Sequence, residues 1–312
     1  MAKRKNRFGM MYLLTALLVI ATLAAAYVAW EMTPCTTGAV PPPGTILSGG
    51  QTMEVHALNL GQSGCVLIKA GEYTALVDAG DIGDDQKLAD YLDAQGVKRL
   101  DVVIATHPHA DHIGAMKYVV EHYEIGKLVM PRLDQKVIPT SKLYKNLLLA
   151  IKDKGLTVTQ ATPGLTLELG EAKLTVLGPV GSYSELNNYS VVSRLDFGQR
   201  SFLLTGDAEK ESEKDILASG AQLKADVLWV GHHGGATSSS EAFLDAVSPV
   251  AAFLQCGVGN SYGHPHKEPL ERLAARNIQV YRTDLDGNIV FSTDGTNLAV
   301  RTDTDSNFKT LE

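Results

Sequence analysis

Histidine and aspartate side chains crowd into one short stretch of the chain, and this crowding predicts a metal site. His107, His109, Asp111 and His112 supply four potential ligands within six positions. Imidazole nitrogens and carboxylate oxygens suit zinc and its neighbours among the divalent ions. Because the run has the form His-x-His-x-Asp-His, a loop can present its ligands in two directions, which suits two metal ions side by side. Capping of a helix would need one polar residue, not four.

The elements that must position this run are predicted from hydrophobic periodicity. The run lies between a short buried strand expected at 102–105 and a helix expected at 113–122. Further helices are expected at 85–95, 141–154, 209–217, 241–247 and 269–276. Strands are expected at 53–59, 65–69, 74–77, 157–160, 165–169, 173–177, within 190–204, and at 227–230, 251–255, 280–282, 288–292 and 298–301. Strands mixed with helices throughout predict an α/β or α+β fold in which helices cover sheets.

The N-terminal end has the pattern of a membrane anchor. Four basic residues precede an uncharged run of 23 residues, 8–30. A helix needs roughly 20 such residues to cross the hydrocarbon core of a bilayer. Basic residues before the run favour a cytoplasmic N-terminus, and the aromatic residues Tyr27 and Trp30 suit the far interface. The alternative is a signal peptide cleaved near 24–29, where small residues recur, followed by secretion.

Under either alternative the chain beyond residue 30 is exported, and its composition bears on what it can bind. Residues 1–30 are assigned to the basic end and the transmembrane helix, 31–51 to a spacer rich in Pro and Gly, and 52–312 to one folded domain. The whole chain is 45% hydrophobic, which supplies a sizeable core. From residue 51 onward there are 24 Lys and Arg (28 minus 4) against 34 Asp and Glu (35 minus 1), a balance of −10. This acidity argues against a broad nucleic-acid surface and leaves room only for a local basic groove.

The run 106–112 resembles the signature of the metallo-β-lactamase superfamily, and other motifs occur in that family's order. They are Val77-Asp78-Ala79-Gly80, Thr205-Gly206-Asp207 and Val230-Gly231-His232-His233-Gly234. The resemblance implies a four-layer αββα sandwich. It also implies that Asp207 bridges two ions and that the Asp78 carboxylate supports the histidine run from behind.

A narrower resemblance concerns the extracellular hydrolase domain of competence proteins of the ComEC/Rec2 type. It covers residues 53–301 and adds Gly61-Gln62, Asn260-x-Tyr262-Gly263-His264-Pro265 and Arg282-Thr283-Asp284-x-Asp286-Gly287. One departure is Ser63-Gly64, where that family often has an acidic residue. Another departure is from metallo-β-lactamases proper, which place a lone histidine where this chain has Asn187-Asn188-Tyr189-Ser190. We interpret Asn188 as a feature of the competence type, beside a first metal site that has few ligands.

The resemblance implies a complete ligand set. The first ion would be held by His107, His109 and Asp207, and the second by Asp111, His112, Asp207 and His232. His233 and His264 are candidates for supporting or substrate-phosphate contacts, while a plain turn role is the alternative for His264 and His266. The expected cofactor is zinc, as one or two ions, with manganese as the alternative. We expect Asp111, His112 and Asp207 to act in catalysis.

The function implied is hydrolysis by a metal-activated water, with a small-molecule or nucleic-acid phosphodiester as substrate. The subfamily favours a membrane-anchored phosphodiesterase or nuclease with its domain outside the cytoplasm. Three alternatives stay open: an esterase for phosphorylated or choline-bearing groups, a lactam or lactone hydrolase of the same fold, and a catalytically silent binding module.

Other polar residues receive structural interpretations. His56 lies within a strand pattern, and His122 lies near a helix end, where a cation meets the helix dipole favourably. The charged run 209–214 is interpreted as a solvated helix face. Asp284 and Asp286 beside Gly287 predict a turn.

Overall fold

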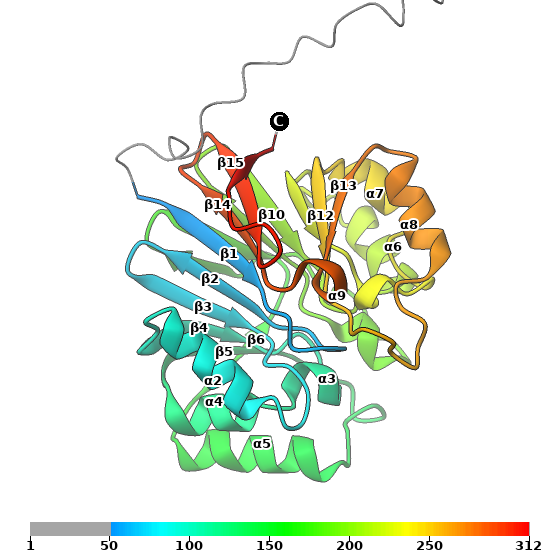
Figure 1. Ribbon diagram of the computed structural model, residues 1–312. Coiled ribbons are helices and arrows are strands. Elements are labelled where there is room, and N and C mark those ends of the chain that lie inside the picture. Colours follow the sequence, from blue (N-terminus) through cyan, green and yellow to red (C-terminus); the bar gives the residue numbers. More distant parts are fainter. Residues whose placement is uncertain (1–50, 312) are drawn as a thin grey trace, which may run out of the picture. The chain divides into compact units, whose positions relative to one another are not determined.

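The computed structural model describes residues 51–311, and within them the strands form two mixed sheets (Figure 1). The larger sheet has the strand order β16-β15-β14-β1-β2-β3-β4-β5-β6. Its strands are β1 (Met53–Ala57), β2 (Val66–Ala70), β3 (Tyr73–Val77), β4 (Arg99–Ile104), β5 (Glu124–Pro131), β6 (Val158–Ala161), β14 (Ile289–Thr293), β15 (Leu298–Thr302) and β16 (Lys309–Thr310). Strands β3 to β6 are parallel neighbours, while β1, β2 and β3 pair antiparallel.

The smaller sheet has the order β13-β12-β11-β10-β9-β8-β7. Its strands are β7 (Thr166–Leu169), β8 (Ala172–Val176), β9 (Ser193–Phe197), β10 (Arg200–Leu204), β11 (Val227–Trp229), β12 (Ala251–Leu254) and β13 (Gln279–Arg282). Strands β10 to β13 are parallel, and β7 to β10 form an antiparallel meander. Each sheet therefore has a parallel part in which several strands end at the same edge.

Helices cover the outer face of each sheet. The larger sheet carries α2 (Asp85–Ala94), α4 (Met116–His122) and α5 (Lys142–Asp153), and the smaller one carries α6 (Lys210–Ala218), α7 (Glu241–Val247) and α8 (Lys267–Ala274) (Figure 1). A central core between the sheets contains Phe202, Phe253 and Phe291. One further core lies between the larger sheet and its helices, and another lies between the smaller sheet and its helices. The domain is thus the αββα sandwich that the resemblance implied.

Local sequence accounts for most of these elements. Helix α5 begins at Ser141, whose hydroxyl accepts a hydrogen bond from the amide of Tyr144 at 3.2 Å. Its buried residues Leu147, Ala150 and Ile151 share one face at helical spacing. Strand β4 ends in the uninterrupted apolar run 102–104, all of it buried, because both faces of this strand are covered.

The prediction of one helix at 113–122 was wrong. The structure has a short helix α3 (Ala110–Ile113) followed by the separate helix α4. The amides of Gly114 and Ala115 bond to the carbonyls of Gly80 and Ala79, so the backbone leaves the helical pattern to reach the loop after β3. An ideal Cβ at Gly114 would lie 2.0 Å from the carbonyl carbon of Asp81, so only glycine permits this approach.

The predicted anchor, 1–30, lies outside the described residues, as does all of the 31–51 spacer but its last residue. Within residues 51–311, no helix combines the length and the apolarity that crossing a membrane requires.

Candidate metal centre

The predicted ligands come from loops that follow parallel strands in both sheets. The histidine run follows β4, and Asp78 follows its neighbour β3. In the other sheet, Asp207 follows β10 and His233 follows β11. Because the carboxyl ends of parallel strands meet at one edge, residues more than a hundred positions apart converge there.

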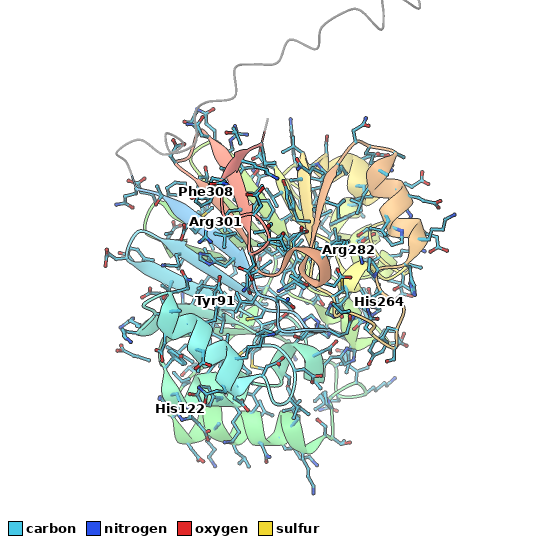
Figure 2. All side chains as sticks on the ribbon, viewed as in Figure 1. Tyr91, His122, His264, Arg282, Arg301 and Phe308 are labelled. Atoms are coloured by element: carbon cyan, nitrogen blue, oxygen red, sulfur yellow. The ribbon has the colours of Figure 1, made fainter. Side chains whose placement is uncertain are left out.

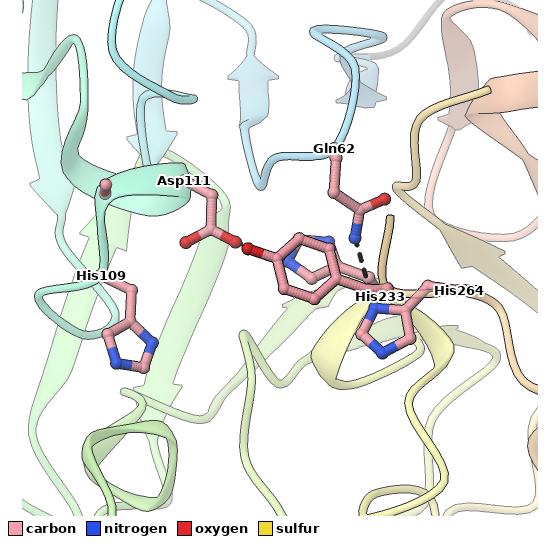
Figure 3. Close-up of a pocket in the computed structure, with 7 residues that line it drawn as sticks. Gln62, His109, Asp111, His233 and His264 are labelled. Carbon is pink, nitrogen blue, oxygen red and sulfur yellow. Dashed lines mark hydrogen bonds and ion pairs between the residues drawn. The ribbon is translucent and has the colours of Figure 1, made fainter. Parts of the chain in front are cut away.

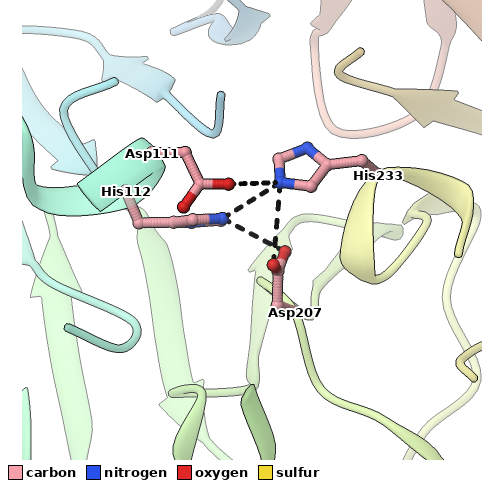
Figure 4. Close-up of side chains that lie close together, drawn as sticks. All are labelled: Asp111, His112, Asp207 and His233. Carbon is pink, nitrogen blue, oxygen red and sulfur yellow. Dashed lines mark hydrogen bonds and ion pairs between the residues drawn. The ribbon is translucent and has the colours of Figure 1, made fainter. Parts of the chain in front are cut away.

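Four side chains meet in one compact group. One ligand atom each from Asp111, His112, Asp207 and His233 lies within 4.8 Å of all the others. The His112 Nε2 atom is 3.1 Å from Asp207 Oδ1 and 3.3 Å from His233 Nε2. The His233 Nε2 atom is 3.2 Å from Asp111 Oδ2 (Figure 4). This acid–histidine cluster has donors that all face a common point.

The other oxygen of Asp207 is approached by His107, which also contacts His109, and by His233 Nε2 at 3.6 Å. His107 Nε2 lies 3.8 Å from Asp207 Oδ2 and 3.0 Å from His109 Nδ1. The rings of His107 and His112 are 4.3 Å apart between centroids. Asp207 therefore stands between two groups of donors, the arrangement that a bridging carboxylate requires.

Neighbouring atoms orient the imidazole rings. The Asp78 carboxylate is buried and lies 2.6 Å from His112 Nδ1, so that nitrogen donates and Nε2 points toward Asp207. His233 Nδ1 donates to the carbonyl of Gln255 at 2.7 Å, and its Nε2 also points toward Asp207. His107 Nδ1 is 3.1 Å from Thr106 Oγ1. A second partner of this kind sets the tautomer of a metal-binding histidine.

The electrostatics of the cluster reflect its closely packed charges. Burial opposes ionisation of Asp207, yet His112 and His233 outweigh it and hold the pKa of Asp207 well below its usual range. Burial also opposes protonation of His112, but Asp207 and Asp78 raise its pKa well above the usual value. Burial lowers the pKa values of His107 and His109. Neutral imidazoles are the form in which histidine binds metal.

The donor set fits divalent cations. Nitrogen atoms from His112 and His233 and oxygen atoms from two aspartates converge, and the other nitrogen of each ring is occupied. Nitrogen and carboxylate donors suit zinc, manganese and related ions. His112 Nε2 and His233 Nε2, 3.3 Å apart, face each other without room for a proton on both. These two nitrogens would serve as donors to a bound divalent ion.

His232 and His233 occupy the reverse of their predicted places. His232 was assigned to the second ion and His233 to a supporting role, but His233 lies in the acid–histidine cluster. The Nδ1 atom of His232 instead lies 3.0 Å from Glu209 Oε1. Both histidines have positive φ, 52° and 53°, and this tight left-handed turn points the two neighbouring side chains to different sides. Of this pair, His233 is therefore the histidine that lies in the acid–histidine cluster, and His232 lies beside Glu209.

The asparagine pair also differs from its interpretation. The Asn188 Oδ1 atom accepts hydrogen bonds from the backbone amides of Glu209 and Ser212, so it caps helix α6 and faces away from the acid–histidine cluster. Its neighbour Asn187 faces the site, with Nδ2 3.3 Å from His232 Nε2. The buried Oδ1 atom of Asn187 has no hydrogen-bond partner among the described residues. Asn187 is thus the member of the pair that contacts His232 and Glu209.

The prediction that 209–214 is a solvated helix face was wrong for the partly buried Glu209 and the buried Glu213. Glu209 binds His232 and also accepts a hydrogen bond from Thr237 Oγ1 at 2.8 Å. Glu213 is 2% exposed and accepts hydrogen bonds from the amides of Ser239 and Ser240. Both carboxylates brace the loop that follows β11, and their helical spacing gave no sign of this.

A pocket of about 340 Å³ opens beside the acid–histidine cluster (Figure 3). Its lining residues are Gln62, His109, Ala110, Asp111, His233, Tyr262 and His264. His264 lies 3.3 Å from Gln62 Nε2. Burial, with His232 nearby, lowers the pKa of His264 to about 4, so this ring is neutral near pH 7. Gln62 and Tyr262 were not predicted as site residues, although both stand in motifs that carried the narrower resemblance.

The remaining histidines lie apart from the donors or serve the backbone. His56 is buried in β1 and lies 2.9 Å from the Tyr91 hydroxyl. His122 bonds to the carbonyl of Tyr118 on α4 and lies far from His264 (Figure 2). His266 Nδ1 accepts the amide of Ala236, which favours the turn role for this residue.

Comparison with known proteins finds one matching family model and several related bacterial proteins. Residues 58–258 match the family model described as the metallo-beta-lactamase superfamily. ComE operon protein 3 of Bacillus subtilis is 34% identical over 208 residues, 66% of this chain and 26% of that protein. Competence protein ComA of Neisseria gonorrhoeae is 30% identical over 76% of this chain and 32% of its own length. Recombination protein 2 of Haemophilus influenzae is 29% identical over 76% of this chain and 28% of its own length.

This chain therefore spans about a quarter to a third of the length of these relatives. Among solved structures, the metallo-beta-lactamase fold protein YhfI from Bacillus subtilis has a TM-score of 0.52 and 15% identity, and the match covers 78% of this chain and 100% of that one. At that identity the match supports the fold alone.

Proposed function

The chain belongs to the metallo-β-lactamase superfamily and is related to competence proteins, and from that premise we propose that it is a metal-dependent phosphodiesterase acting on nucleic acid outside the cytoplasm. The observation that carries the proposal is the convergence of donors on both oxygens of Asp207. His112 approaches one oxygen at 3.1 Å, while His107 at 3.8 Å and His233 at 3.6 Å approach the other. Such a two-sided site suits two ions and the hydrolysis of a charged diester.

Specific residues would hold the ions. His107, His109 and Asp207 would hold one, and Asp111, His112, Asp207 and His233 the other. Bound divalent ions supply a water of lowered pKa and positive charge opposite the anionic oxygens of a phosphodiester. The charge of Asp207 is available at all ordinary pH values, because nearby histidines keep its pKa well below the usual range despite its burial.

The chain's own groups would position the reactants. Asp111 lines the pocket and is partly exposed, so its carboxylate can accept a hydrogen bond from the attacking water and orient it. Gln62 donates to His264 Nδ1, which leaves the proton of the neutral ring on Nε2. That N–H is a donor for an oxygen of the substrate. Asp78 would keep the His112 ring in its orientation during the reaction, and the Gln255 carbonyl would do the same for the His233 ring.

Nucleic acid is proposed as substrate because of the relatives. Their names refer to competence and recombination, and they cover 66–76% of this chain. The balance of −10 beyond residue 50 means that such a substrate would be bound locally at the pocket, not along a basic face. A small phosphodiester is the simpler substrate of the same site.

The test is a metal analysis joined to a substrate panel. The purified full chain is assayed with single-stranded DNA, bis-p-nitrophenyl phosphate, a phosphocholine ester and nitrocefin, with zinc or manganese. We expect hydrolysis of the first two, and a loss of at least about 100-fold in Asp207→Asn and His107→Ala, because outer partners of metal ligands alone contribute 10–100-fold. Asp245→Asn, which removes a surface ion pair with Arg276, is the matched control.

Each other result has a defined meaning. Turnover of nitrocefin alone would overturn the phosphodiesterase proposal in favour of a lactam hydrolase, and turnover of the phosphocholine ester alone would favour an esterase. If His107→Ala and Asp207→Asn leave metal content unchanged and no substrate reacts, the chain is a silent binding module.

We further propose that residues 1–30 anchor the domain to the outer side of the cytoplasmic membrane. The support is the uncharged run 8–30 behind four basic residues. The proposal predicts that the protein stays in carbonate-washed membranes and that added protease digests the domain in spheroplasts. Recovery of a shortened protein in the medium would favour a cleaved signal peptide, and protection from protease would place the domain in the cytoplasm.

A further inference from the structure

Tyr262 presents an aromatic ring to solvent at the pocket beside the acid–histidine cluster. Its side chain is 66% exposed, although it lines the same pocket as Asp111 and His233. Val258, four residues earlier in the same loop, is 83% exposed. Apolar side chains that gather on the surface beside a pocket mark a candidate binding surface. The loop 257–266 therefore offers unused apolar surface next to the reacting groups.

The Tyr262 ring ends a stack of rings that begins in the acid–histidine cluster. His233 and His264 are stacked with 21° between their planes and 6.1 Å between centroids. His264 and Tyr262 are stacked in the same manner, at 21° and 5.7 Å. Offset stacks of this spacing are favourable. One face of the Tyr262 ring is thus covered by His264, and a further planar ring would extend the stack on the other face.

The loop holds the ring on a fixed backbone. Asn260 Nδ2 donates to the carbonyls of Gly257 and His264, and Asn260 Oδ1 accepts the amide of His264. His266 Nε2 donates to the carbonyl of Tyr262 at 3.2 Å. A ring on such a braced loop loses little conformational freedom when a ligand binds, because its backbone is already ordered.

The pocket lacks the positive charge that would bind phosphates beyond the reacting one. No lysine or arginine is among its lining residues in the described part of the chain. Affinity for an extended nucleic acid must then come from its bases more than from its backbone. A quaternary ammonium group would need several aromatic faces around it. Tyr262 offers one flat face, which matches a planar base better.

We propose that Tyr262 is a stacking platform for a nucleobase of the substrate, next to the phosphodiester that is cleaved, and so determines specificity for single-stranded nucleic acid. This inference rests on the proposed phosphodiesterase function. Stacking of this kind accepts any base, so it selects unpaired strands without selecting sequence. Because few phosphates are neutralised, binding depends only weakly on salt concentration.

The test compares a short deoxyoligonucleotide with an abasic deoxyribose-phosphate oligomer of the same length. In the wild-type full chain we expect the KM of the abasic oligomer to be about tenfold higher, the size typical of one stacked base. In Tyr262→Ala the two KM values become equal, and in Tyr262→Phe the difference is kept. Tyr73→Ala removes an exposed tyrosine from the opposite end of β3 and keeps the wild-type ratio. Anisotropy of the labelled oligomers gives the same comparison for binding.

The outcomes separate this inference from the proposed function. If Tyr262→Ala leaves the KM ratio unchanged, the stacking proposal is overturned while the phosphodiesterase stands. If neither oligomer is cleaved but the deoxyoligonucleotide binds through Tyr262, stacking stands and the proposed reaction fails. If neither oligomer binds, or if only a phosphocholine ester depends on Tyr262, the nucleobase proposal is overturned.

Discussion

Replacing Asp78 by asparagine should weaken metal binding at His112 by about 10–100-fold without changing a metal ligand. The Asp78 carboxylate accepts three hydrogen bonds: one from the Thr106 amide, one from the Thr106 hydroxyl and one from His112 Nδ1, at 2.6–2.7 Å. In Asp78→Asn the side-chain oxygen can still accept the hydrogen bond from the Thr106 amide. The new NH₂ group, however, would face His112 Nδ1, and two donors cannot form a hydrogen bond with each other. His112 then moves its proton to Nε2, the atom that faces Asp207.

The size of the effect can be worked out from these contacts. A protonated Nε2 cannot bind a cation, and loss of such a supporting partner costs about 10–100-fold in metal affinity, or about 1.4–2.7 kcal/mol. The metal-free protein loses one buried charge-assisted hydrogen bond, while the Thr106 hydroxyl can turn to accept from the new amide. We therefore expect a decrease of about 1.5–3 kcal/mol in the free energy of unfolding.

Metal affinity is measured by competition with a chromophoric chelator, and stability by urea denaturation of the metal-free protein. Asp101→Asn is the matched control, since the Asp101 carboxylate also accepts an amide of a neighbouring strand, that of Thr74, at a place remote from the donors. Its metal affinity should equal that of the wild type. Wild-type affinity in Asp78→Asn itself would refute the tautomer argument.

Four further predictions rest on single contacts. Asn188→Ala removes the acceptor for two amides at the start of α6 and should cost about 1–2 kcal/mol of stability in urea denaturation, with metal content unchanged. Loss of metal in this variant would contradict a purely capping role for Asn188. Gly114→Ala sets a Cβ against the Asp81 backbone and should lower stability by about 3 kcal/mol or more, so an unchanged melting temperature would contradict the close approach. Burial lowers the pKa of His56 below its ordinary 6.5, so the protein takes up a proton when it unfolds in acid. The stability of the wild type relative to His56→Gln should therefore fall as the pH drops below about 6.5. A stability difference that does not change with pH would exclude this coupling. Chelation of the metal should lower the melting temperature of the wild type more than that of Asp207→Asn, because only a bound ion stabilises the folded state, and equal shifts would argue against Asp207 as a ligand.

The helices and strands were predictable from the sequence because their signals are local, whereas the αββα sandwich was implied by the family resemblance. Apolar alternation, helical periodicity and turn residues located nearly all strands and helices within a few residues. The dense run 107–112 identified the chemistry because such a run has few other uses. The resemblance to the metallo-β-lactamase superfamily and to competence proteins is confirmed by the comparisons. The membrane anchor at 1–30 stays a prediction.

The roles of adjacent residues depended on distant contacts, which the sequence does not contain. Of the neighbours His232 and His233, only the second meets the acid–histidine cluster, because two left-handed residues separate their side chains and the Gln255 carbonyl orients His233. Glu209 has the sequence pattern of a solvated residue, but in the structure it contacts His232 and Thr237 of the loop after β11. The position of a backbone in space, set by packing between two sheets, decides which way each side chain points. Sequence therefore determined which residues could do the chemistry, and tertiary structure decided which of them face one another.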